Sequence, residues 1–434
     1  MNTYLQTTFA FFSTLLMTAL GSAANPRLDL NDVSWVWPLH KTEADVDGLI
    51  AMDSLKDSTG AAIWSDKQFG ELLELAESDD AKVGNKKIRL NFEFKTKATW
   101  KIAGISIDPS APGANEATVK KLGSSPQIRL IVQPVTKDNG KAVVHDFAAH
   151  MIFSFAANGQ RGVPDKVKFK SILEGVDAVK KRSIDNGVST SGPFGVHPGL
   201  SANVNGLDTA MREILLTHLT EKNLSAMSIM GLPNDFEPWI FVALSPTTSG
   251  FKRVPFLPPQ MLSFVPPEGV SPSPIANNLN SIGSELFVAD AAMRKGVATS
   301  VLFVEGVRVD ELAIVGKDTG GNNVTDTSVK NQNIPDIVAN PMKSHFFNTD
   351  CVSCHTESQR RSILQLPVSE SAFQVNGNPP KIADDVVSKH RWNVCNFGWF
   401  SDALDSQRLT VATVTQRTAN ETAEVVAFIE REYC

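Results

Sequence analysis

The sequence predicts an α+β protein, in which a large β-rich domain with an antiparallel sheet and a few helices precedes a small, mostly α-helical domain. The sheet is predicted by segments between residues 87 and 155 in which apolar and polar side chains alternate. Turn residues such as Asn139 and Gly140 separate these segments, as in antiparallel hairpins. The helical domain is predicted by an amphipathic segment at the C-terminal end, residues 418–433.

The remaining elements follow from the same two periodicities. Alternation over residues 87–95 is the clearest strand signal, because all four apolar residues fall on one side. Apolar stripes at helical spacing, each beginning at a suitable first turn, predict helices over 164–182 and 207–223. Further strands are expected at 100–108, 127–135, 143–155, 224–232 and 237–244.

The first 24 residues have the features of an export signal. An apolar run from about Phe9 to Leu20 precedes small residues, so cleavage is expected after Ala23 or Ala24. No Lys or Arg precedes the run, which leaves an uncleaved anchor as the alternative. Because the run is short for a membrane span of about 20 residues, cleavage is favoured. The expected location is the periplasm or the exterior.

Composition limits the possible partners. The chain has 41 Lys and Arg against 47 Asp and Glu, a net charge of −6, and no basic block, so nucleic acid is not expected as a partner. No stretch after the signal is apolar enough to span a bilayer, so stable membrane insertion is not expected after signal removal. The remaining chain is long for one core. Two domains are therefore predicted, over 25–330 and 331–434, with a polar loop before the second.

The larger predicted domain offers no recognisable chemistry. It contains no phosphate-binding or nucleophile motif. Trp35, Trp37 and Trp64 are expected to pack in the core or between the domains. His218 lies beside an apolar helical stripe, which favours an interior histidine over a metal ligand. Three further histidines are too scattered along the sequence to predict a metal cluster: His145, His150 and His197.

One short motif near the C-terminal end does carry chemistry. Cys351 and Cys354 are three residues apart, and His355 follows at once. This is the spacing for covalent attachment of haem through two thioethers, with the histidine as the proximal ligand of iron. A redox disulfide and half of a zinc site are the alternatives. Zinc needs about four ligands, whereas the other cysteines, Cys395 and Cys434, stand apart without a second paired motif.

The last part of the chain, from about residue 340, resembles a small single-haem c-type cytochrome domain. In that family a first helix leads into the CxxCH motif and a last helix packs across it. Phe347 and either Phe428 or Ile429 match the side chains that meet where these helices cross. Pro367 matches the proline whose carbonyl accepts the proton of the proximal histidine. The terminal helix is expected to begin with a capping box at Thr418 and Glu421.

This sequence departs from the family at the distal ligand. Electron-transfer cytochromes c usually supply a methionine downstream of the motif, but no methionine follows Met342. His390 is the only later histidine and is the leading candidate for the sixth ligand of iron. His345 and Met342 are weaker candidates, because they precede the motif closely on the expected first helix. An iron with five ligands is the alternative.

The resemblance implies a periplasmic protein that holds one haem c per chain and exchanges electrons with a redox partner protein. Two other functions stay open: a haem peroxidase or gas sensor with an open sixth position, and a cell-envelope binding protein with an accessory haem. An electron carrier is favoured over an enzyme. The remaining pair, Cys395 and Cys434, is expected to form a disulfide in an oxidising compartment, with two free thiols as the alternative.

Overall fold

A computed structural model gives the fold. It describes most of the chain between residues 27 and 253 and shorter parts of the remainder. The described ranges are 27–38, 43–78, 89–90, 92–109, 125–145, 147–160, 162–231, 239–253, 287–289, 301–304, 307–310, 336, 339–341, 373–375, 377–386, 397–401 and 410–434. The predicted signal peptide lies outside these ranges.

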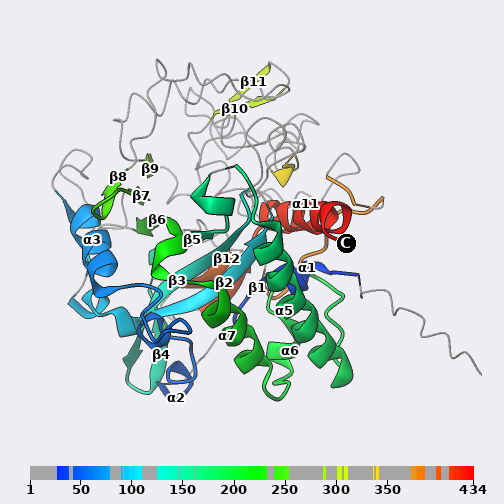
Figure 1. The fold of residues 1–434 in the computed structure, drawn as a ribbon, viewed down its shortest axis with the longest axis horizontal. Helices are drawn as coiled ribbons and strands as arrows, with labels where there is room; N and C mark the ends of the chain where they lie inside the picture. Colours follow the sequence, from blue (N-terminus) through cyan, green and yellow to red (C-terminus); the bar gives the residue numbers. More distant parts are fainter. Residues whose placement is uncertain are drawn as a thin grey trace, which may run out of the picture.

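A large antiparallel sheet forms the centre of the molecule (Figure 1). Seven strands follow one another in the order β1-β2-β3-β5-β6-β7-β8, while β4 pairs with β3 and β9 pairs with β7, and every pairing is antiparallel. The large antiparallel sheet that the alternation predicts is therefore confirmed. Its strands are β1 (Ser34–Val36), β2 (Trp100–Asp108), β3 (Gln127–Asp138), β4 (Lys141–Val144), β5 (Phe147–Ser154), β6 (Leu224–Gly231), β7 (Trp239–Pro246), β8 (Phe251–Arg253) and β9 (Phe287–Ala289).

Two further hairpins lie outside this sheet, β10 (Val301–Val304) with β11 (Val307–Asp310) and β12 (Phe397–Ser401) with β13 (Thr410–Val414). Within the sheet, the turn predicted between β3 and β4 is present. Asn139 and Gly140 both have positive φ angles, 50° and 81°. Residues other than glycine and asparagine rarely adopt this backbone conformation. Positive φ angles at both turn positions match the right-handed twist of the two strands that a tight hairpin joins.

Two helices lie side by side in front of the sheet, α5 (Lys166–Asp185) and α7 (Leu207–His218) (Figure 1). Both agree with predicted helices. The Asp165 side chain caps α5 by accepting a hydrogen bond from the Lys168 N–H at 2.9 Å. The helices approach closely at Gly175, where an added Cβ would lie 3.0 Å from Ile214. Glycine at this position thus permits the two helices to pack.

The other helices are shorter or lie at the sheet margin. Helix α3 (Asp66–Glu77) contacts β6, β7 and β8, and Ser65 caps it through the Gln68 N–H. Three α-helices have one turn each: α1 (Leu30–Val33), α2 (Glu43–Val46) and α6 (Pro198–Ser201). Short 3-10 helices span Met52–Ser54, Phe92–Lys95, Lys97–Thr99, Ala157–Gly159 and Glu221–Asn223.

The predicted strand over residues 87–95 is wrong, because Phe92–Lys95 forms a 3-10 helix. Its apolar residues do not share a face. Phe94 is buried against the rings of His145 and Phe147, whereas Phe92 is 86% exposed. The Leu90 N–H donates to the Glu77 carboxylate at 2.8 Å instead of a neighbouring strand. Tertiary partners therefore override a local alternation that resembles a strand.

The C-terminal helix α11 (Gln416–Glu432) is confirmed, but its capping differs from the prediction. The helix begins earlier, with Thr415 as its cap: the Thr415 hydroxyl accepts from the Thr418 N–H at 3.2 Å. Glu421 pairs with Arg417 at 2.6 Å, four residues before it, and so does not close a capping box with Thr418. The Thr418 box is therefore wrong, because an alternative threonine lies three residues earlier.

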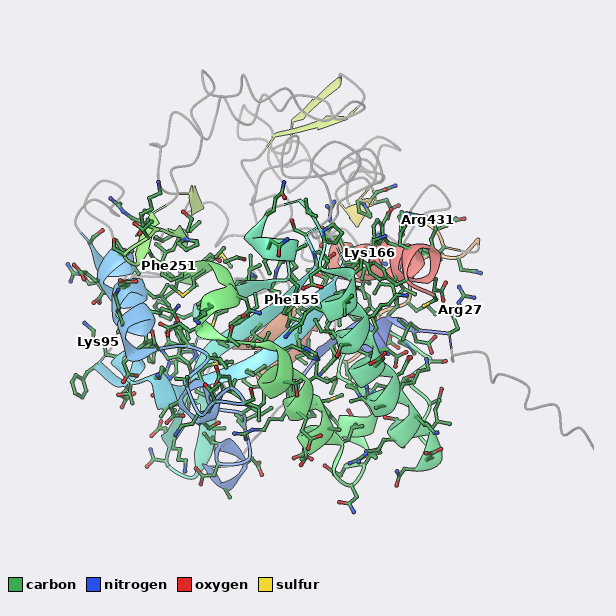
Figure 2. The ribbon with its side chains drawn as sticks, in the orientation of Figure 1. Arg27, Lys95, Phe155, Lys166, Phe251 and Arg431 are labelled. Carbon is green, nitrogen blue, oxygen red and sulfur yellow. The ribbon has the colours of Figure 1, made fainter. Side chains whose placement is uncertain are left out.

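Helix α11 packs against the beginning of the described chain. It contacts α1, and the Tyr433 ring meets the Phe169 ring of α5 at 4.9 Å. The Arg27 guanidinium pairs with Glu430 at 3.0 Å, and Figure 2 shows Arg27 and Arg431 on the same side of the molecule. The two ends of the described chain therefore lie together.

One hydrophobic core includes residues from both sides of the boundary predicted near residue 330. Val414 and Ile429 belong to the same buried cluster as Val36 and Leu130. Residues 311–335 lie outside the described ranges, so the division into two domains stays a prediction. The described part of 331–434 contains the β12–β13 hairpin as well as α11. A small, mostly helical domain in this region also stays a prediction.

Candidate functional site

The residues of the haem-attachment motif, Cys351, Cys354 and His355, lie outside the described residues, as do Phe347, Pro367, His390 and Cys395. The structure does describe the chain on both sides of the motif. Cys434 is exposed and forms no disulfide with any described residue. Burial, together with the charges of Asp177 and Glu430, raises the pKa of this thiol. Because Cys395 is not described, the disulfide with Cys434 stays a prediction.

The upstream flank of the motif is held by α11. The Asn420 side-chain amide donates to the Ala339 carbonyl at 2.8 Å, and the Arg417 guanidinium donates to the Asn340 carbonyl at 3.3 Å. Asn420 is 1% exposed, and both flank residues are buried. These bonds satisfy backbone carbonyls that would otherwise be desolvated without a partner. Ala339 and Asn340 are therefore held against α11.

The downstream flank joins the loop that precedes α6. Phe194 and Ile382 form a parallel bridge: the Phe194 N–H donates to the Lys381 carbonyl at 2.8 Å, and its carbonyl accepts from the Ala383 N–H at 3.0 Å. Val386 is buried next to Gly195, where an added Cβ would lie 2.9 Å from it. This flank is therefore part of the same packed body as the upstream one.

The β12–β13 hairpin, which begins two residues after Cys395, is anchored by a buried side-chain amide. The Gln133 side chain accepts from the Trp399 N–H at 2.7 Å and donates to the Trp399 carbonyl at 2.7 Å. The Trp399 indole N–H donates to the Trp37 carbonyl at 2.8 Å. Gln133 thus binds Trp399 as a neighbouring strand would, with one donor and one acceptor.

Glycine allows the hairpin to approach β2. An added Cβ at Gly104 would lie 2.9 Å from the Phe397 ring, which itself stacks on Phe194 at 5.9 Å. The pairing of β2 with β3 is irregular here, with a register shift between Ile102 and Gly104. The hairpin covers one face of β2 and β3, which explains why both strands are buried on both faces along much of their length.

A buried ion-pair network lies at the beginning of the described chain. The Lys180 ammonium donates to Asp32 at 2.6 Å, to Asp29 at 2.7 Å and to the Arg27 carbonyl at 2.6 Å. Burial opposes the charge of Lys180, but the hydrogen bonds to Asp29 and Asp32 outweigh it and raise the pKa of this lysine. The network therefore holds residues 27–32 against α5.

Two histidines are buried and neutral. Burial lowers the pKa of His197 to about 4, and its Nδ1 accepts from the Gly199 N–H at 3.1 Å. Burial, followed by the charge of Lys168, lowers the pKa of His218 to about 4 as well. The expectation that His218 is an interior residue is confirmed, since it is 5% exposed. None of the described residues forms a hydrogen bond with its Nδ1.

The tryptophans of the larger predicted domain pack in the core, as expected. Trp35, Trp37 and Trp64 are each less than 5% exposed. Among the described residues, no group of three or more His, Cys, Asp or Glu side chains is arranged to hold a metal ion. The helices of the described ranges include none that is both long and apolar enough to cross a membrane.

Sequence reasoning missed the polar side chains that hold the motif flanks and the hairpin. The sequence does contain a signal for them. Gln416 and Asn420 are one helical turn apart and lie on the same side of the predicted helix as Ala423, where apolar residues are expected. Gln133 likewise interrupts an apolar strand.

Comparison with known proteins gives no match: no family model, no curated protein and no solved structure matches this chain. Function is therefore inferred from the CVSCH motif and the export-like segment.

Proposed function

We propose that this chain is a periplasmic c-type cytochrome that carries one covalently bound haem and transfers electrons to or from a redox partner protein. The observation that carries the proposal is the CVSCH motif, Cys351 to His355, in a chain that begins with an export-like segment. Two thiols and an adjacent imidazole are the donor set that haem c requires. Disulfide exchange or zinc binding explains fewer of these features.

The haem supplies an iron that cycles between the ferric and ferrous states. Cys351 and Cys354 would hold the porphyrin, and His355 would ligate iron from the proximal side, with its ring oriented by the Pro367 carbonyl. Covalent attachment suits an exported electron carrier, because the cofactor cannot be lost to the surroundings. Residues 331–434 would then include a small, mostly helical, cytochrome c-like domain, to which α11 contributes the last helix.

Covalent attachment is tested by haem staining of the denatured protein. Protein exported from cells that mature cytochromes c should keep its haem stain after boiling in SDS and reductant, because thioether bonds survive both treatments. Cys351→Ala and Cys354→Ala should each lose most of the stain. Cys434→Ala is the matched control, since it removes a cysteine outside the motif and should keep the stain. An unstained wild-type band would refute the assignment.

A second function, that of a haem peroxidase or gas sensor, is favoured by one observation: no methionine follows Met342. The choice depends on whether His390 ligates iron. An electron carrier in which both His355 and His390 would ligate iron should show a low-spin spectrum in both oxidation states and bind carbon monoxide slowly. His390→Ala should then become high-spin and bind carbon monoxide rapidly.

The matched control for this ligand is His345→Ala, a change at the histidine on the other side of the motif. This control should retain the wild-type spectrum. A wild-type protein that is already high-spin and binds carbon monoxide rapidly would instead support the enzyme or sensor. A low-spin spectrum that survives His390→Ala would show that another residue is the sixth ligand.

A further inference from the structure

Arg129 of β3 carries a buried charge that no acidic side chain of the described residues pairs with. Its Nε is buried, and none of the described residues accepts a hydrogen bond from this atom. Burial lowers the pKa of Arg129. The charges of Asp108 and Glu421 oppose this shift only in part, and no hydrogen bond joins the guanidinium to either carboxylate. A buried charge without a bonded counter-charge is unfavourable, so this position calls for an anion.

Two further hydrogen-bond donors lie beside Arg129 on the same face of the sheet. Gln127 precedes it by two residues in β3, so both side chains leave the strand on one face. Gln127 is 8% exposed, and its Nε2 has no hydrogen-bond partner among the described residues. Ser106 of β2 is directly opposite Arg129. Because the Ser34 hydroxyl donates to the Ser106 oxygen at 2.9 Å, the Ser106 hydrogen is not used in that bond.

We call Ser106, Gln127 and Arg129 the donor cluster. Strands β2 and β3 are neighbours within the large sheet (Figure 1). Opposite residues of such a pair have Cβ atoms about 4.5–5.5 Å apart, and alternate residues of one strand are about 6.5–7 Å apart. One small ligand can therefore meet all three side chains. Ser106 and Arg129 keep partial exposure, so the cluster is in contact with solvent.

The charges around the donor cluster favour a ligand with a single negative charge. Asp108 is opposite Gln127 in β2 and is 2% exposed, and the charge of Glu421 also acts on Arg129. An ion with two negative charges would be repelled by both carboxylates, whereas Arg129 balances one charge. A guanidinium also offers two parallel N–H groups that match the two oxygens of a carboxylate. The donor set therefore suits a monocarboxylate better than a phosphate or sulfate.

We propose that the donor cluster binds the carboxylate of a small organic acid on this face of the sheet. Arg129 would pair with the carboxylate, while Gln127 and Ser106 would each donate one more hydrogen bond to it. The proposal goes beyond the function proposed above, since the donor cluster lies outside the haem-attachment motif and binds its ligand with or without haem. The alternative is a purely structural role for Arg129.

Isothermal titration of the full chain with propionate tests the site. Propionate carries one carboxylate and a short apolar tail, and wild-type protein should bind it saturably with one molecule per chain. Sulfate and chloride at the same ionic strength should bind about tenfold more weakly or less, because sulfate carries a second charge and chloride cannot accept two parallel N–H bonds. Tighter binding of sulfate than of propionate would overturn the assignment to a carboxylate.

Arg129→Met removes the charge and keeps most of the apolar stem. Its affinity for propionate should be about tenfold lower or less, because charge-assisted hydrogen bonds contribute more than neutral ones. Without ligand, the variant should be at least as stable in urea as wild type, because it removes a buried charge that has no bonded partner. A purely structural arginine predicts the reverse: lower stability of Arg129→Met and an unchanged response to propionate.

Arg182→Met is the matched control. Arg182 is an exposed arginine of α5 that donates to the Gly206 carbonyl, so the substitution removes the same charge outside the donor cluster. Its affinity for propionate should equal that of wild type. If Arg129→Met does not fold, Ser106→Ala and Gln127→Met test the site, each with an expected loss of about threefold or more in affinity. Absence of saturable binding to wild type, or equal affinities in the cluster variants and Arg182→Met, would reject the site.

Discussion

Lys180→Met is expected to lower the free energy of unfolding by about 3–5 kcal/mol, because it breaks a buried ion pair and leaves one partner behind. The substitution keeps the length and apolar stem of the side chain. Asp32 remains buried, at 4% exposed, and loses its closest cationic partner. Equilibrium denaturation in urea at neutral pH measures the loss.

The double variant Lys180→Met/Asp32→Asn separates the lost charge pairing from lost packing. Removing both charges relieves the buried carboxylate, so the double variant should be more stable than Lys180→Met alone. A double variant that is less stable than the single one would show that the ion pair is not the source of the effect. Lys181→Met, a change at the adjacent exposed lysine of α5, should be nearly neutral.

The loss in Lys180→Met should also depend on pH. Burial raises the pKa of Asp32 above 3.8, and removing Lys180 removes interactions that lower it. A carboxyl whose pKa is higher in the folded state than in the unfolded state binds its proton more tightly when folded. The deficit relative to wild type should therefore be complete at neutral pH and shrink as the pH falls through the raised pKa toward 3.8. A deficit that grows on acidification would contradict this account.

Gln133→Met is expected to cost about 2–5 kcal/mol, because the N–H and the carbonyl of Trp399 would both lose their partners in a buried place. Methionine matches glutamine closely in size, so the change isolates the hydrogen bonds from the volume. The same variant should loosen the β12–β13 hairpin, visible as faster exchange of the Trp399 N–H. Urea denaturation and hydrogen exchange measure the two effects.

A matched control lies on the same face of the same strand. Gln127 is also buried, at 8% exposed, but its side-chain amide nitrogen has no hydrogen-bond partner in the part of the chain that the structure describes. Gln127→Met should therefore change stability by less than about 1 kcal/mol, because no buried partner is left behind. Equal losses in the two variants would indicate that side-chain volume, and not the pairing with Trp399, decides stability at these positions.

The sequence by itself determined the features that depend on local patterns. Alternation predicted β2, β3, β5, β6 and β7, helical spacing predicted α5, α7 and α11, and the dipeptide at Asn139 predicted a tight turn. The CVSCH motif is equally local, since the spacing of two thiols and one imidazole suffices to predict haem attachment. The chemistry assigned to this chain still comes from that motif.

Tertiary structure alone decided the features that depend on partners distant in the sequence. The segment around Phe94 does not form a strand, although its sequence alternates like one, because Glu77, His145 and Phe147 supply other contacts. The pairing of Gln133 with Trp399 joins residues far apart in the chain, and so do the bonds from α11 to Ala339 and Pro380. A polar residue in an apolar pattern signals that a buried partner is required, but the partner's identity depends on how the whole chain packs, because any backbone carbonyl can accept the bond.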